Sequence, residues 1–265
     1  MKRYRLTPGK PTHLAEFDPA ETRLVRGGKE SAIRKSASIL ERLNQQQELL
    51  YAGRQHKLLI VLQGMDTSGK DGTITHVMGG FNPQGVRVIS YKRPSEVELD
   101  HDYLWRVHAQ VPAKGEIVIF NRSQYEDVLV VRVHNLVPEA EWQQRYAQIN
   151  EFERMLAENG TTILKFFLHI SSDEQKKRLE KRIEDPARRW KFQHGDLTER
   201  KLWPQYMEAY EAAMEKTSTS WAPWYVVPSD SKWYRNYIIG SVVADTLEKM
   251  DMKYPEIDLS KEVIE

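Results

Sequence analysis

The sequence predicts an α/β protein whose sheet is parallel and is covered by helices on both faces. Helical patterns alternate with apolar runs typical of strands, which lie at residues 58–62, 86–91, 117–120, 163–170 and, more weakly, 224–227. Strands that are apolar on both faces are buried on both faces, as in parallel sheets. The length of 265 residues, with 40% hydrophobic and 29% charged residues, fits one globular domain and excludes a disordered chain.

The elements are predicted in the following order. Residues 1–28 contain three prolines and end in the Gly27-Gly28 pair, which indicates an irregular arm. A helix is expected from about residue 30 to 51, because apolar residues recur there at intervals of three and four, and Gly53 is its expected end. Further helices are expected at about residues 70–78, 96–110, 139–158, 173–184, 198–216 and 233–250.

Charge and composition narrow the class of protein. Thirty-nine basic residues against 38 acidic ones leave a net charge of +1, so any binding of a polyanion must be local. The absence of cysteine excludes disulfides, thiolate catalysis and cysteine-bound metals. No apolar run approaches the ~18 residues of a membrane span, and no signal peptide is evident, so we expect a cytoplasmic protein with no membrane partner.

A phosphate-binding loop is the strongest motif. Gly64, Gly69 and Lys70 match the pattern G-x-x-x-x-G-K between a strand and a helix, and the loop also contains Thr67 and Ser68. Glycines allow backbone N–H groups to turn inward, the helix N-terminus adds positive potential, and the lysine reaches the outer phosphates. The alternative is a plain glycine turn.

The loop departs from ordinary nucleotide-triphosphate loops at one position. Asp71 stands where a serine or threonine hydroxyl normally binds Mg²⁺. Asp66 adds a second carboxylate, which would repel phosphate unless a divalent cation lay between them. The two acids therefore predict metal-bridged phosphate or an acceptor held by carboxylate, although Asp71 is also explained as an acid in the first helical turn.

A second polar segment follows the third predicted strand. Asn121 occupies the place where a metal-binding aspartate often ends such a strand, and Glu126 and Asp127 come about one helical turn later. Arg122 is expected to point toward the transferred phosphate. An ordinary salt-bridged helix start is the alternative, but both segments lie at the carboxyl edge of the predicted sheet, where ligands bind.

A basic tract spans residues 176–191, in which eight basic residues against three acidic ones give a net charge of +5. Arg178, Lys181 and Arg182 share one helix face. The tract has the position of a lid that closes over phosphates, with a solvated helix face as the alternative. Lys92, Arg93 and Arg132 are expected to extend the positive surface near the site.

With these segments assembled, the chain resembles the family 2 polyphosphate kinases over nearly its full length. The resemblance lies in residues 63–73, 120–128, 165–170, 189–191 and 222–227. It implies a single P-loop kinase domain over residues 1–265, similar to thymidylate kinase, with about five parallel strands, an arm at 1–28, and a lid with its following helix at about 172–216. It also implies reversible phosphoryl transfer between inorganic polyphosphate and nucleotides, dependence on Mg²⁺ or Mn²⁺, and a homodimer or homotetramer.

The resemblance implies roles for individual residues. Asp66 would orient the acceptor phosphate and the metal, and Asp127 would be a metal ligand or an acceptor-side carboxylate. Lys70 and Arg122 would bind the transferred phosphoryl group. The combination of Asn121 and Glu126 is similar to that of the subgroup acting on both AMP and ADP. The polyphosphate-binding set would be Gly64, Thr67, Ser68, Gly69, Lys70, Asp71, Arg122, Arg178, Lys181 and Arg182. The nucleotide-binding set would be Lys92, Arg93, Glu126, Arg132 and Arg189.

The expected reaction is therefore attack of a nucleotide phosphate oxygen on the terminal phosphate of polyphosphate. Adenine nucleotides are the expected acceptors, and guanine nucleotides are left open. Two alternatives remain at this point: an ATP-dependent nucleoside monophosphate kinase, and a non-catalytic module that binds a polyanion such as RNA. The second is disfavoured because aromatic residues do not alternate with the basic tract, so no nucleic-acid partner is expected.

Overall fold

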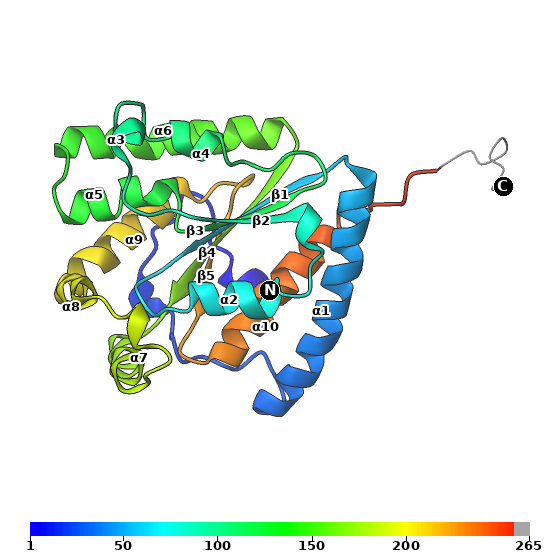
Figure 1. The fold of residues 1–265 in the computed structure, drawn as a ribbon, viewed down its shortest axis with the longest axis horizontal. Coiled ribbons are helices and arrows are strands. Elements are labelled where there is room, and N and C mark those ends of the chain that lie inside the picture. The colour runs from blue at the N-terminus through cyan, green and yellow to red at the C-terminus, as the bar shows by residue number, and fades with distance from the viewer. Residues whose placement is uncertain (257–265) are drawn as a thin grey trace.

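A computed structural model describes residues 1–256 of the chain. Its centre is one five-stranded sheet in the order β2-β3-β1-β4-β5, and every neighbouring pair is parallel (Figure 1). The strands are β1 (Lys57–Gln63), β2 (Val86–Ser90), β3 (Ile117–Asn121), β4 (Thr161–His169) and β5 (Trp224–Pro228). The predicted parallel α/β fold is confirmed, and each strand begins and ends within two residues of its predicted bounds.

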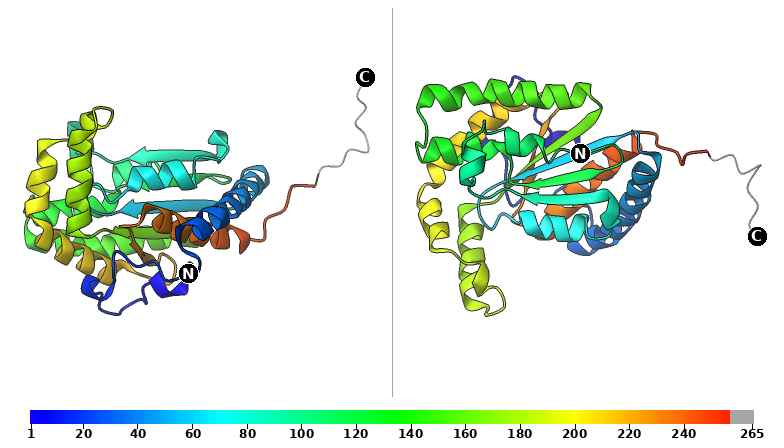
Figure 2. Two further views of the ribbon diagram at one scale, coloured as in Figure 1. Left: turned by 90° about the horizontal axis from the view of Figure 1, so that it is seen from below. Right: turned by 45° about the horizontal axis from the view of Figure 1, so that its top comes forward.

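Helices cover both faces of the sheet because alternate strand residues point to opposite sides. Leu59 and Val61 pack with α6 (Glu139–Glu158) and α9 (Trp203–Thr217) in one buried cluster. Leu58 and Ile60 pack in a second cluster, against α1 (Gly28–Gly53), α2 (Lys70–Val77) and α10 (Lys232–Glu248). The three layers are visible in Figures 1 and 2. α1 ends at Gly53 as predicted.

Two predicted helices are each broken in two. Residues 96–110 form α3 (Glu96–Leu99) and α4 (Trp105–His108), because the side chain of Asp102 accepts a bond from the Leu104 N–H and turns the chain between them. Residues 198–216 are divided between α8 (His194–Lys201) and α9. The break falls at Leu202, just before Pro204, which has no N–H to continue a helix. A short helix, α5 (Val130–Val133), was not predicted.

The N-terminal arm is irregular, as predicted, but it is packed closely against the sheet. Tyr4 is buried and its hydroxyl lies 2.6 Å from that of Tyr234 on α10. The Leu6 N–H donates to the Trp224 carbonyl at 2.9 Å, and Arg5 forms an antiparallel bridge with Tyr225. The arm therefore covers the outer edge of β5.

The predicted lid segment begins with α7 (Ser172–Glu184), continues through a 3-10 turn (Arg189–Lys191), and reaches α8. Figure 2 shows α7 and α8 side by side beyond the carboxyl ends of the strands. This is the edge of the sheet that carries the loop between β1 and α2. Within residues 1–256 no helix combines the length and the apolar character needed to cross a membrane.

Candidate active site

The loop between β1 and α2 has a backbone that requires glycine at both ends. Gly64 has φ of +150° and Gly69 has φ of +107°, and a Cβ on Gly64 would lie 2.8 Å from the Leu168 carbonyl oxygen. Thr67, between them, is also left-handed, with φ of 63°. Side chains disfavour such values, so the loop conformation is held by its surroundings.

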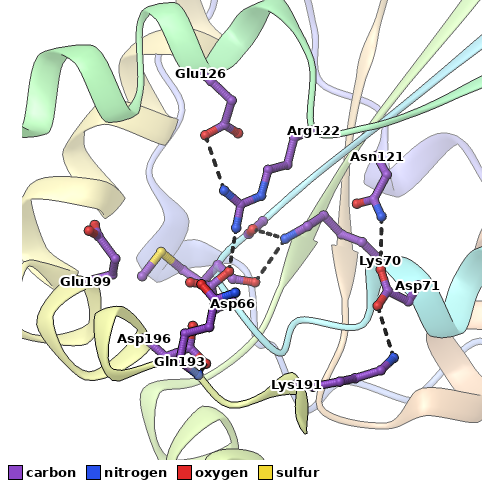
Figure 3. Close-up of polar contacts among 12 residues, drawn as sticks. Asp66, Lys70, Asp71, Asn121, Arg122, Glu126, Lys191, Gln193, Asp196 and Glu199 are labelled. Atoms are coloured by element: carbon purple, nitrogen blue, oxygen red, sulfur yellow. Dashed lines mark hydrogen bonds and ion pairs between the residues drawn. The ribbon is translucent and has the colours of Figure 1, made fainter. Parts of the chain in front are cut away.

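Lys70, at the start of α2, bends back over this loop (Figure 3). Its Nζ donates to the Gly64 carbonyl at 2.6 Å and to the Met65 carbonyl at 3.3 Å. The side chain is buried, and burial, reinforced by the nearby charge of Arg122, lowers the pKa of Lys70 to about 8. The ammonium is thus held at the mouth of the loop, where a bound phosphate would restore its preference for the charged form.

Arg122, just after β3, joins the second predicted segment to the loop. Its Nη2 lies 2.7 Å from Asp66 Oδ1, and its Nη1 lies 4.0 Å from Glu126 Oε2 (Figure 3). The backbone of Arg122 is left-handed, with φ of 64°, which turns the side chain away from the line of the strand. The carboxylates of Glu126 and Asp66 outweigh the effect of burial and raise the pKa of Arg122. The structure therefore brings four predicted site residues together: Asp66, Lys70, Arg122 and Glu126.

Asp71 is placed between the sheet and the lid. It lies in the first turn of α2, where Asn121 Nδ2 donates to its Oδ1 at 2.9 Å and Lys191 Nζ lies 3.4 Å from its Oδ2 (Figure 3). Burial acts to raise the pKa of Asp71, but these two partners outweigh it and lower the pKa. Asp71 therefore links β3 to the lid.

Asp127 has a different environment from Asp66. It is buried, and Arg145 of α6 donates to both its carbonyl and its Oδ1 at 3.2 Å. Burial raises the pKa of Asp127 to about 6, although Arg145 opposes the shift. Within residues 1–256 no group of three or more histidine, aspartate or glutamate side chains is arranged to hold a metal ion.

The basic tract is divided between two kinds of contact. Arg178 uses all five of its N–H groups on protein acceptors: Glu174 and the carbonyls of Thr67, Ser68, Ser229 and Asp230. This differs from the expected contact with polyphosphate, because the guanidinium is taken up by the loop itself. Arg182 lies 3.1 Å from Asp196 of α8, which places it within the lid, and Lys181 is exposed.

The expected nucleotide-binding residues other than Glu126 lie outside this group of contacts. Lys92 and Arg93 are exposed after β2, and Arg132 stacks over the Trp142 ring at 4.9 Å. Arg189 donates to the Ile183 carbonyl at 2.9 Å inside the lid. Their role in binding a nucleotide stays a prediction.

Four residues of the site were not predicted to belong to it. Gln175 donates to the Asp66 carbonyl at 3.1 Å, and Arg235 donates to the Ser68 carbonyl at 3.0 Å. Lys191 contacts Asp71, and Asp196 faces Asp66 across the site, where burial and the charge of Asp66 raise its pKa (Figure 3). Lys191 was part of the basic tract, but nothing in the local sequence marks the other three.

The site combines a glycine loop at a helix N-terminus, a lysine and an arginine beside that loop, and a basic lid at the same sheet edge. This combination defines a phosphotransferase of the P-loop class. The family model for polyphosphate kinase 2 matches residues 27–255. The chain belongs to the polyphosphate kinase 2 family and is a polyphosphate kinase.

Individual relatives agree with this assignment. An AMP/ADP-polyphosphate phosphotransferase of Meiothermus ruber is 58% identical, over 100% of this chain and 99% of that protein. An ADP-polyphosphate phosphotransferase of Rhodopseudomonas palustris is 44% identical, over 96% of this chain and 92% of that one. The crystal structure of polyphosphate kinase 2 from Arthrobacter aurescens TC1 superposes with a TM-score of 0.93 at 46% identity, covering 97% and 92% of the two chains.

Proposed function

We propose that this polyphosphate kinase transfers the terminal phosphate of inorganic polyphosphate to AMP and to ADP, reversibly and with a divalent cation, Mg²⁺ or Mn²⁺. The observation that carries the proposal is the ion pair between Arg122 and Asp66 next to the buried Lys70. Two cations aimed at the mouth of the loop neutralise a phosphate chain, and a carboxylate among them favours a metal or an acceptor group beside that chain.

The carboxylates of the site fit a hard cation that binds together with the phosphate substrate. Mg²⁺ is commonly held by one or two carboxylates plus substrate phosphates, without a complete cage of protein ligands. Asp66, whose side chain is 24% exposed beside the loop, meets this need, whereas the side chain of Asp127 is only 12% exposed. When bound, the cation would neutralise charge on the phosphate oxygens. We therefore propose Asp66 as the carboxylate ligand, with Asp127 in the surrounding shell.

The protein's own residues act mainly by position and charge. A nucleotide phosphate oxygen is already an anion, so the attack needs little help from a general base. Lys70 and Arg122 would bind the phosphoryl group, and Arg182 and Lys191 would bring the lid over it. Because these positively charged side chains lie around the loop, we infer that polyphosphate lies along the loop and that the nucleotide lies on the side of Glu126.

Substitution of the loop lysine tests the proposal. Lys70→Ala should lower kcat at least ~100-fold, as loss of a preorganised donor does in other enzymes. The assay measures ATP and ADP formed from AMP and from ADP with polyphosphate, Mg²⁺ and no added ATP, with GDP as a test of base preference. Near-normal turnover in the variant, or no product from polyphosphate in the parent chain, would contradict the proposal. The second outcome would favour an ATP-dependent nucleoside monophosphate kinase.

A further inference from the structure

Arg235 of α10 lies against the backbone of the phosphate loop, far from it in sequence. The side chain is 2% exposed, and its Nη1 donates to the Ser68 carbonyl at 3.0 Å. The other donors, Nε and Nη2, both reach Asn236 Oδ1 at 3.2 and 3.0 Å. A Cβ on Gly69 would lie 1.8 Å from this Nη1, so only glycine lets the guanidinium approach so closely.

A second guanidinium meets the first at the same carbonyl. Arg178 Nη1 donates to the Ser68 carbonyl at 3.1 Å and to the Thr67 carbonyl at 2.9 Å. Gln175, one turn earlier on α7, holds the Asp66 carbonyl at 3.1 Å. Three successive carbonyls of the loop are thus held by side chains of α7 and α10.

The direction of the carbonyls determines where the loop presents its N–H groups. In a trans peptide the C=O and the following N–H point in opposite directions, and the described peptides are all trans. Holding the carbonyls of Asp66 and Ser68 toward α7 and α10 therefore turns the N–H groups of Thr67 and Gly69 to the other side. Inward N–H groups are what a phosphate requires from such a loop.

The pair also carries charge that the protein does not neutralise. Glu174 lies 2.8 Å from Arg178, but among residues 1–256 no carboxylate lies within 4.0 Å of the Arg235 guanidinium. Lys232 adds positive charge nearby, and burial with the charge of Arg178 lowers the pKa of Arg235 to about 9. A buried cation without an acid partner is costly in an ordinary protein interior, and it becomes favourable when an anion occupies the adjacent loop.

We propose that Arg235 and Arg178 are positioning residues of the phosphate loop: they hold its carbonyls so that its N–H groups face bound polyphosphate, and the charge of Arg235 adds to the affinity for that anion. The proposal rests on the proposed function, since it takes polyphosphate as the occupant of the loop. It assigns the two arginines to the loop backbone, and it leaves direct phosphate contacts to Lys70, Arg122 and the outer lid.

The test compares Arg235→Met, Arg235→Lys and Arg42→Met for KM and kcat with polyphosphate and with ADP. Arg42 is the matched control, because it too contacts α10, through Glu248 at 2.6 Å, and lies outside the loop. Arg235→Met should raise KM for polyphosphate at least about tenfold, a loss of about 1.4 kcal/mol, and leave KM for ADP within about twofold. Arg235→Lys should give an intermediate KM, because it keeps the charge but loses the forked geometry. Arg42→Met should match the parent chain.

Several outcomes would overturn the proposal. An unchanged KM for polyphosphate in Arg235→Met would do so, as would an equal rise of both KM values with a lower melting temperature, which indicates general loosening of the fold. Should Arg235→Met fail to fold, Arg235→Lys decides alone, and a KM for polyphosphate equal to that of the parent refutes the proposal. Lys70→Ala distinguishes failure of this inference from failure of the proposed function. If Lys70→Ala loses activity while the Arg235 variants behave like the parent, only the inference about Arg235 fails.

Discussion

The buried ion pair between Lys165 of β4 and Glu153 of α6 is the sharpest test of how the active-site edge is supported. Both side chains are completely buried, and Lys165 Nζ lies 2.6 Å from Glu153 Oε2. Lys165 also donates to the Tyr125 hydroxyl and to the Thr217 carbonyl, both at 2.8 Å, while Gln124 and Tyr125 donate to Glu153 Oε1 at 3.1 and 2.8 Å. The pair thus anchors the segment that directly precedes Glu126.

Breaking this pair on one side should be severe. Glu153→Gln leaves the Lys165 ammonium buried without an opposite charge, and loss of one partner of a buried pair costs about 3–5 kcal/mol of unfolding free energy. Lys165→Met should cost a similar amount by leaving Glu153 alone. Burial by itself lowers the pKa of Lys165 and raises the pKa of Glu153, so each charge depends on the other.

The double variant Glu153→Gln/Lys165→Met should cost less than the more damaging single variant. It leaves no unpaired charge, and the amide oxygen of the new glutamine side chain keeps an acceptor for Gln124 and Tyr125. Urea unfolding followed by circular dichroism measures all three free energies. Costs that simply add in the double variant, or single variants below about 1 kcal/mol, would refute the reasoning, since uncoupled sites are additive. The exposed pair Glu151 and Arg154, on the same helix, is the control, and Glu151→Gln/Arg154→Met should leave the urea midpoint unchanged.

Two further predictions concern pH. Because the pKa of Lys70 is lowered to about 8, the free enzyme loses this charge above that pH, and kcat/KM for polyphosphate should fall about tenfold per pH unit there. A Lys70→Arg variant should lack this alkaline decrease. If the decrease persists in the variant, the titrating group is not Lys70. Burial raises the pKa of Asp127 from 3.8 to about 6, so the folded state binds this proton more tightly than the unfolded state and loses stability as pH rises from 3.8 to about 6. The unfolding free energy of Asp127→Asn relative to the parent should therefore increase over that range, by up to about 3 kcal/mol, and a difference that does not vary with pH would exclude Asp127 as the titrating group.

Local patterns predicted the parts of the protein that depend on neighbouring residues. The strands were found from apolar runs, and the loop at residues 64–70 and the segment at 121–127 were found from spacing. Their meeting at one sheet edge followed from the rule that parallel strands end together, whereas the ion pair between Arg122 and Asp66 was not predicted.

The remaining features depend on contacts between distant segments. Arg178 was expected to contact polyphosphate because of its place in a charge run and because of the family resemblance, but neither shows which acceptors surround one guanidinium. Arg235 reaches a loop 167 residues away, and nothing in the sequence around it marks this contact. The glycine at position 69, which leaves room for its guanidinium, is already explained by the phosphate-loop motif. The breaks at Asp102 and Leu202 were missed because single polar and proline side chains overrode the apolar periodicity.

The arm over β5 has a consequence for self-association. A bare strand edge is a template for pairing with another chain. The sheet ends at β2 on one side and at β5 on the other, and the arm occupies the β5 side through Arg5 and Leu6. With the arm in place, β2 is the one edge of the sheet that has no backbone partner on its outer side within the described residues. Removal of the arm would leave the β5 edge without a backbone partner as well, and each molecule would then present two templates for pairing with another chain.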